Sequence, residues 1–163
     1  LRAYQKERVL VLLDVSRDPL GAAYQVIQSQ TAIGSGGLWG KGFGHGTQTH
    51  LKFLPEQETD FIFSVIGEEF GFIAVAFILV FFAFLVLDMI QRAYRTSERF
   101  PSLVLFGITV LFMSHIFVNV GMTVNLLPVK GLPLPFISYG GTFLVSCYAM
   151  LGLAMNMSIE STD

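Results

Sequence analysis

A run of eighteen uncharged, mostly apolar residues, 70–87, most constrains what this chain can fold into. It reads FGFIAVAFILVFFAFLVL, which is long enough for an α-helix to cross the hydrocarbon core of a membrane. The whole chain agrees with this interpretation, because 53% of its residues are hydrophobic and only 13% are charged. The sequence therefore predicts a membrane protein.

Two later apolar stretches predict further spans, so we expect an all-α polytopic membrane protein with three transmembrane helices. These helices are predicted at residues 61–90, 102–127 and 143–159. The connection 91–101 contains three arginines, whereas the connection 128–142 contains a single basic residue, Lys130. The positive-inside rule then places 91–101 and the tail 160–163 in the cytoplasm, and residues 1–60 and 128–142 on the opposite side.

Residues 1–60 are expected to form a large extracytoplasmic loop with short amphipathic helices and a glycine-rich turn. Seven glycines fall within residues 34–46, together with Lys41. Two interpretations of this cluster stay open. In the first, the backbone N–H groups of the cluster approach a pyrophosphate. In the second, its glycines permit tight bends over a membrane surface.

The second outer loop, 128–142, is apolar but rich in proline and glycine. Irregular backbone of this kind is tolerated at membrane depth only where protein buries it or where it lines a cavity. We therefore expect a re-entrant loop that forms the wall of a cavity, with Ser138 near the start of the third helix. A rigid hairpin that only joins two helices is the alternative.

Asp60 directly precedes the first predicted span, and Glu56 and Glu58 lie just upstream. A carboxylate held where water meets lipid can act on a lipid-linked substrate. Since Thr and Asp are also common helix N-caps, a purely structural role for Asp60 stays open.

Several polar residues fall within the predicted spans. Glu68 and Glu69 lie near the start of the first span, either as functional intramembrane carboxylates or as residues at its interface. His115, Asn119 and Thr123 recur at intervals of four in the second span, so they share one helix face. Such a face is typical of interhelical packing, and a substrate role is the alternative.

Three motifs resemble those of the shape, elongation, division and sporulation family, which comprises RodA, FtsW and SpoVE. They are LPEQETDFIF at 54–63, GEEFG at 67–71 and LPVKGLPLPFISYGG at 127–141. AIGSGGL at 32–38 and GHGTQ at 44–48 are more similar to the RodA branch, whereas Lys130 is closer to FtsW. The resemblance covers about residues 1–157 and indicates the C-terminal portion of a longer protein.

This resemblance implies a peptidoglycan glycosyltransferase that polymerises lipid II at the outer face of the bacterial inner membrane. Asp60 matches the aspartate regarded as catalytic in the family, where it would act as the general base. We expect substrate contacts from Lys41, Gln48, Glu58, Lys130 and Ser138. Lys41, Lys130 or a divalent cation, Mg²⁺ or Mn²⁺, would neutralise the departing pyrophosphate.

The sequence departs from the family at two positions near these motifs. Glu58 stands where relatives often have His, which adds negative charge near Asp60, and Asn125 stands where they often have Gly. The fragment is expected to be inactive alone, because its pocket would lack the helices of the missing N-terminal part.

The family resemblance also implies a protein partner, a class B penicillin-binding transpeptidase whose membrane helix docks on these spans. Two other functional classes stay open, a transporter of lipid-linked precursors (a flippase) and a noncatalytic scaffold of the cell-wall synthesis complex. The formal net charge of −2 gives no indication of nucleic acid as a partner.

Overall fold

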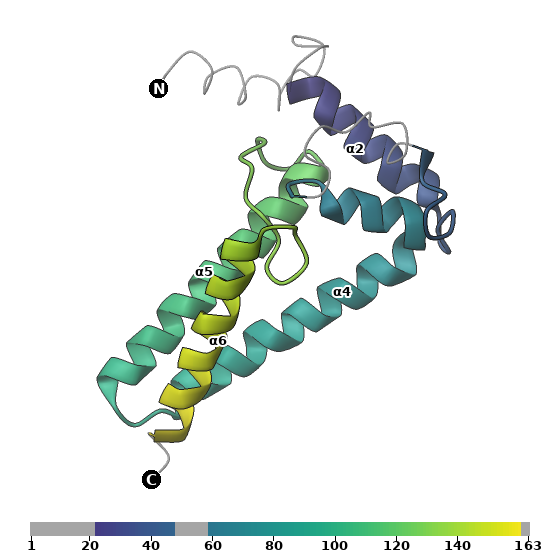
Figure 1. Cartoon of the computed structure of the whole chain (residues 1–163). Coiled ribbons are helices and arrows are strands. Elements are labelled where there is room, and N and C mark those ends of the chain that lie inside the picture. Colours follow the sequence, from purple (N-terminus) through teal and green to yellow (C-terminus); the bar gives the residue numbers. More distant parts are fainter. Residues whose placement is uncertain (1–21, 48–58, 161–163) are drawn as a thin grey trace.

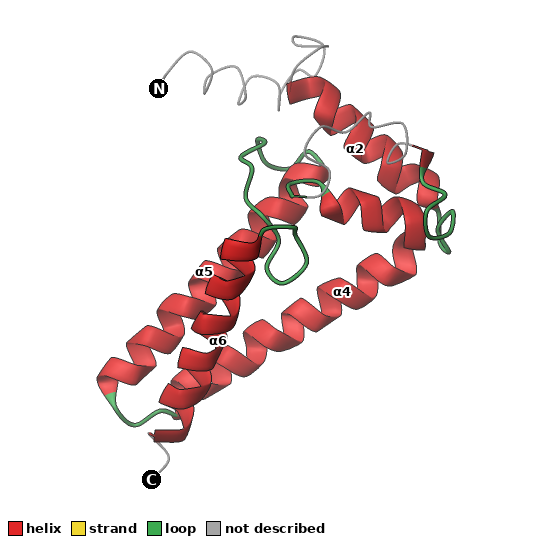
Figure 2. Ribbon diagram, viewed as in Figure 1, coloured by secondary structure: helices red, strands yellow, loops and turns green. Residues whose placement is uncertain are grey.

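The computed structural model describes residues 22–47 and 59–160, and within them every regular element is a helix (Figures 1 and 2). The helices are α2 (Ala22–Gly36), α4 (Ile62–Arg95), α5 (Arg99–Thr123) and α6 (Gly141–Glu160). Three helical segments, Ile62–Arg95, Arg99–Thr123 and Gly141–Ser158, are long and apolar enough to cross a membrane. The predicted fold class, all-α with three transmembrane helices, is confirmed.

The surfaces of these helices agree with a lipid environment. Large apolar side chains point outward along all three helices, among them Phe77 and Phe84 on α4, Phe106 and Phe117 on α5, and Tyr148 on α6. Exposing so many large apolar side chains to water would be unfavourable, whereas exposing them to lipid is not.

α4 is broken at Gly71, which divides it into a short arm, residues 62–70, and a long arm, residues 72–95. Gly71 has φ 74° and ψ −172°, a backbone conformation that is open almost only to glycine. Figure 1 shows the two arms meeting at a sharp angle, with the short arm beside α2. Glu68 and Glu69 therefore lie in the short arm, before the long apolar arm begins.

The residues that follow α2, 37–46, form a glycine-rich loop that hydrogen-bonds to the main-chain groups freed by this break. A break in a helix frees main-chain carbonyls on one side and N–H groups on the other. The loop donates two hydrogen bonds to the short arm and accepts two from the long arm. These four bonds are Lys41 N to Glu68 O (3.0 Å), Gly42 N to Glu69 O (2.9 Å), Phe72 N to Gly37 O (2.9 Å) and Ile73 N to Leu38 O (3.3 Å).

This pairing bears on the two interpretations of the glycine cluster. The N–H groups of Lys41 and Gly42 bond to protein carbonyls, so they do not point at a ligand. A Cβ atom at Gly40 would overlap the Glu69 carbonyl, so the close approach of loop and helix requires glycine there. The structure favours tight bends over pyrophosphate binding for this part of the cluster.

A small polar junction ties α2, the short arm and the end of α5 together. The Ser29 hydroxyl donates to the carbonyl of Thr123 at 2.8 Å. Ser64 lies 2.7 Å from the same hydroxyl and must donate to it, because Ser29 has only one hydrogen to give. Ser29 and Ser64 are fully buried, so these bonds fix the short arm against the two neighbouring helices.

We predict that Gly71→Ala destabilises the protein by about 2 kcal/mol or more, because alanine is strained at this φ and ψ. Its Cβ would also meet the N atom of Gly40 and lie 2.6 Å from the Leu38 carbonyl oxygen. The measurement is the thermal unfolding midpoint of the full-length protein in detergent.

Gly107→Ala is the matched control, since Gly107 lies inside α5 and a Cβ there would meet nothing within 4 Å. It should leave the midpoint unchanged or raise it slightly. Equal midpoints for the two variants would contradict the role assigned to the break.

Candidate active site

Asp60 lies in the turn that leads into the short arm of α4. The N-cap of α4 is Phe61, which makes no side-chain capping hydrogen bond, so Asp60 stands one residue before the cap. Phe61 is buried in a core cluster with Val26 of α2 and Met122 of α5. This packing fixes the turn while the Asp60 side chain stays half-buried.

The connection between α5 and α6, residues 124–140, is called here the proline-rich loop, and it packs against Asp60. A Cβ atom at Gly131 would lie 2.9 Å from Oδ2 of Asp60 and 3.6 Å from its Cγ, so the carboxylate rests against this glycine. Gly131 also has a positive φ of 62°. Lys130 precedes it and is exposed. Asp60 and the Lys130 segment, far apart in sequence, therefore lie against each other.

Asn119 of α5 holds these two segments in place. Its side-chain amide donates one hydrogen bond to the main-chain carbonyl of Asp60, at 3.0 Å, and a second to that of Leu132, at 2.8 Å. Asn119 is fully buried, and its Oδ1 atom has no hydrogen-bond partner in the described part of the chain. One rigid helix thus positions both the Asp60 turn and the proline-rich loop.

Ser138 makes a second connection between the same segments. Its hydroxyl donates to the carbonyl of Thr59 at 2.6 Å and accepts from the N–H of Leu134 at 2.7 Å. Ser138 is only 5% exposed. The structure therefore places this predicted substrate contact in the support of the Asp60 turn, with its hydroxyl engaged by protein on both sides.

His115, one helical turn before Asn119 on α5, also supports the proline-rich loop. Its Nδ1 lies 3.1 Å from the carbonyl of Pro133, and because a carbonyl only accepts, we assign the proton to Nδ1. The ring also stacks on Phe143 at a centroid distance of 5.2 Å. The polar face predicted on this helix does point inward. The sequence pattern did not show that its partners are loop carbonyls rather than another helix.

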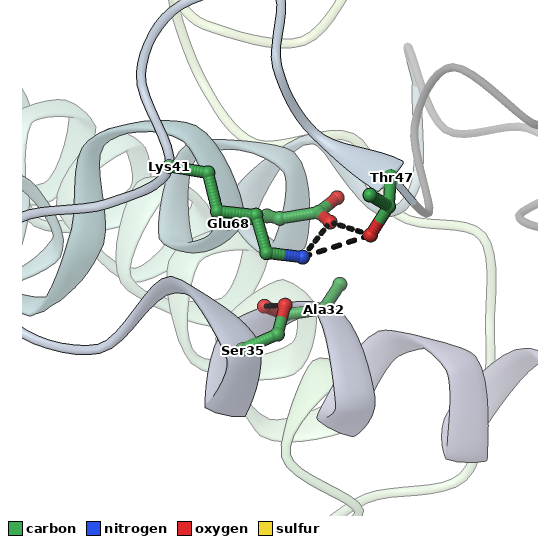
Figure 3. Close-up of polar contacts among 5 residues, drawn as sticks. All are labelled: Ala32, Ser35, Lys41, Thr47 and Glu68. Atoms are coloured by element: carbon green, nitrogen blue, oxygen red, sulfur yellow. Dashed lines mark hydrogen bonds and ion pairs between the residues drawn. The ribbon is translucent and has the colours of Figure 1, made fainter.

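Lys41 lies in an ion pair at the far end of the short arm (Figure 3). Its Nζ is 2.7 Å from Oε1 of Glu68, whose side chain is fully buried, and Thr47 donates to the same oxygen at 3.1 Å. Glu68 is eight positions after Asp60, a rise of roughly 12 Å if the whole stretch were helical. The Lys41 ammonium is thus bound to a protein carboxylate at the end of the short arm that is remote from Asp60.

The other predicted site groups are outside what the structure describes. Gln48 and Glu58 both lie in the stretch 48–58, beyond the described residues. Among residues 22–47 and 59–160, no three or more His, Cys, Asp or Glu side chains come together as a candidate metal site.

Comparison with known proteins identifies the family. The three apolar helices define the class as a multi-pass membrane protein. The model of the FtsW, RodA and SpoVE family, described as cell cycle proteins, matches residues 1–163. The chain belongs to this family, as the sequence motifs indicated.

Two curated relatives show how much of a family member the chain represents. It is 46% identical over 154 residues to the peptidoglycan glycosyltransferase MrdB of Escherichia coli K12, covering 94% of this chain and 42% of the relative. It is 38% identical to the peptidoglycan glycosyltransferase RodA of Treponema pallidum, covering 97% of this chain and 36% of the relative. The chain thus spans less than half the length of these relatives.

Two solved structures share the fold. A chain from a peptidoglycan synthase complex that coordinates polymerization and crosslinking superposes with a TM-score of 0.73 at 32% identity. That comparison covers 99% of this chain and 43% of the other. An aspartate-to-alanine mutant of the rod shape determining protein RodA from Thermus thermophilus gives a TM-score of 0.64 at 25% identity, covering 100% and 59%.

We predict that Asn119→Ala lowers the free energy of unfolding by about 2 kcal/mol, because its two hydrogen bonds to the Asp60 turn and the proline-rich loop, of about 1 kcal/mol each, are lost. The measurements are the unfolding midpoint of the full-length protein in detergent and the rate of proteolysis within the proline-rich loop. The midpoint should fall and the rate of proteolysis should rise.

Ser114→Ala serves as the control on the same helix. The Ser114 hydroxyl is exposed and bonds only to the carbonyl of Leu111 in its own helix, so its removal should change neither quantity. If Asn119→Ala behaved like this control, the positioning role of Asn119 would be wrong.

Proposed function

We propose that this chain is part of a peptidoglycan glycosyltransferase that polymerises lipid II, with Asp60 as its general base. The observation that carries the proposal is the position of Asp60. Its carboxylate is half-buried against Gly131, its main chain is held by Asn119, and the exposed Lys130 follows along the same loop. The names of the relatives, which are peptidoglycan glycosyltransferases, support the choice of reaction.

The reaction joins a sugar hydroxyl to the anomeric carbon of a sugar that leaves from a pyrophosphate. Asp60 accepts the proton of the acceptor 4-hydroxyl while the hydroxyl oxygen bonds to the donor carbon. The bond from that carbon to the pyrophosphate oxygen breaks, and the pyrophosphate departs with the electron pair. Attack opposite the leaving group inverts the configuration from α to β. A positioned base of this kind contributes a rate factor of about 10² to 10⁴.

Lys130 is the group we assign to the departing pyrophosphate. It is exposed and adjoins the glycine on which the Asp60 carboxylate rests, so a substrate that reaches Asp60 also meets its ammonium. Positive charge fixed where negative charge develops stabilises the transition state. The leaving pyrophosphate carries its own oxygen ligands, so a Mg²⁺ or Mn²⁺ ion bound there would assist the same step.

The remaining predicted contacts divide into two groups. Ser138 positions the Asp60 turn through Thr59, and Lys41 neutralises the buried Glu68, so we assign both of them to the architecture of the site. Gln48 and Glu58 remain proposed substrate contacts. A transporter would rely on Glu68, Glu69, His115 and Asn119. It is less well supported, since three of these side chains, Glu68, His115 and Asn119, bond to neighbouring segments of the protein.

The proposed setting is the bacterial inner membrane, with Asp60 and Lys130 on the extracytoplasmic side. The arginines of the 91–101 segment favour this orientation. A class B penicillin-binding transpeptidase is the proposed partner, and the related chain from a synthase complex for polymerization and crosslinking supports it. An apolar groove of about 340 Å³ between α4 and α5, lined by residues that include Phe82, Ile116 and Phe117, suits the membrane helix of this partner.

We predict that Asp60→Asn lowers the rate of glycan-strand formation from lipid II by about 100-fold or more. The asparagine retains the main-chain carbonyl that Asn119 holds, so the substitution removes the base and leaves this contact in place. The measurement uses the full-length parent protein with its transpeptidase partner, at equal membrane abundance of variant and wild type.

Asp88→Asn is the control, because Asp88 lies near the opposite end of α4 in a half-exposed pair with Arg92. It should polymerise lipid II at the wild-type rate and bind the partner normally. Undiminished polymerisation by Asp60→Asn would refute the assignment of Asp60 as the base.

A further inference from the structure

The glycine-rich loop presents an apolar surface to its surroundings. Leu38 is 63% exposed, Trp39 82% and Phe43 80%. Lys41 is the sole Lys, Arg, Asp or Glu in residues 22–47, and its charge is turned inward onto Glu68. The outward side of the loop therefore carries three large apolar side chains and none of these charged groups.

This surface adjoins the part of α4 that would enter a membrane. Four main-chain hydrogen bonds attach the loop to the break at Gly71, where the long arm begins. The Phe43 ring lies 6.1 Å from that of Phe70, and Phe72 and Ile73 are exposed immediately beyond the break. The apolar surface thus continues from the loop onto the outer face of the long arm.

The chemistry of these side chains suits the boundary between lipid headgroups and acyl chains. Indole rings are enriched at this boundary because they have a large apolar body and a single N–H group that can bond to water or headgroups. Leucine and phenylalanine beside the indole favour the acyl side of the boundary. A lysine facing outward between them would stay solvated. Lys41, whose side chain is 26% exposed, instead pairs with the buried Glu68, which neutralises its charge.

We propose that Leu38, Trp39 and Phe43 form a membrane anchor, inserting into the lipid interface at the end of the span where the long arm of α4 begins. The anchor fixes the depth of the break at Gly71 and so of the short arm, which has the Asp60 turn at its other end. This role does not depend on the proposed catalysis. It would hold equally if Asp60 were not a base.

The test measures the depth of the Trp39 indole in the full-length protein reconstituted into phosphatidylcholine nanodiscs. The Trp39 signal is the difference in emission between wild type and Trp39→Phe, which isolates it from any other tryptophan. Nanodiscs made with lipids brominated near the headgroup end of the acyl chains supply a quencher inside the bilayer, and acrylamide supplies one in water. An anchor predicts that brominated lipid quenches the Trp39 signal by about half and that acrylamide quenches it weakly, as expected for insertion of about 5–10 Å.

Thr31→Trp in the Trp39→Phe background gives the matched signal of an indole facing water. Thr31 is exposed on α2 and its hydroxyl bonds only within that helix, so acrylamide and not brominated lipid should quench a tryptophan there. Phe43→Trp in the same background should repeat the behaviour of Trp39.

Two results would overturn the anchor. Quenching of Trp39 by acrylamide alone would place the loop in water, and protection from both quenchers would show that protein covers it. Polymerisation of lipid II, assayed in the same nanodiscs, tests Asp60 separately, because the depth of Trp39 does not depend on turnover.

Discussion

At the end of the membrane spans that lies beside α2, main-chain polar groups need hydrogen-bond partners within the protein, because hydrocarbon offers none. The geometry of the site depends on which protein groups supply these hydrogen bonds. Where α4 breaks at Gly71, the glycine-rich loop supplies the missing bonds. Where the proline-rich loop leaves helical geometry, α5 supplies them through His115 and Asn119. The Asp60 carbonyl is bound by the same asparagine, so the position of this turn follows from the satisfaction of backbone groups.

This arrangement separates the groups that hold the site from those we assign to chemistry. Asn119 and Ser138 are buried and donate to the main-chain carbonyls of Asp60 and Thr59, respectively. Lys130 is exposed and the Asp60 carboxylate is half-buried, so both side chains are accessible to the lipid-linked substrate that we propose. A base positioned by a separate set of buried polar residues is held in place before substrate arrives, and this reduces the reorganisation that catalysis would otherwise require.

Much of the fold was predictable from the sequence, because long apolar runs have few alternatives to a membrane-spanning helix. Topology also predicts that Asp60, the glycine cluster and Lys130 can meet, because all three fall on one side of the spans. The structure brings the Lys130 segment to Asp60, whereas Lys41 of the glycine cluster binds Glu68. The break at Gly71 was not predictable. A lone glycine within an apolar run does not reveal a positive φ, and the acceptors that stabilise the break lie more than thirty residues upstream. Lys41 was assigned to substrate because sequence does not show that Glu68 of the short arm faces it.

The most direct test of Asp60 as the general base is a structure of the full-length parent protein, as Asp60→Asn, with a lipid II substrate bound beside a second lipid-linked acceptor. If Asp60 is the base, the acceptor 4-hydroxyl lies within about 2.6–3.2 Å of the residue 60 side chain, the distance that proton transfer requires. The donor pyrophosphate should then lie beside Lys130. A substrate bound elsewhere, with residue 60 contacting protein alone, would contradict the catalytic assignment and return Asp60 to a structural role.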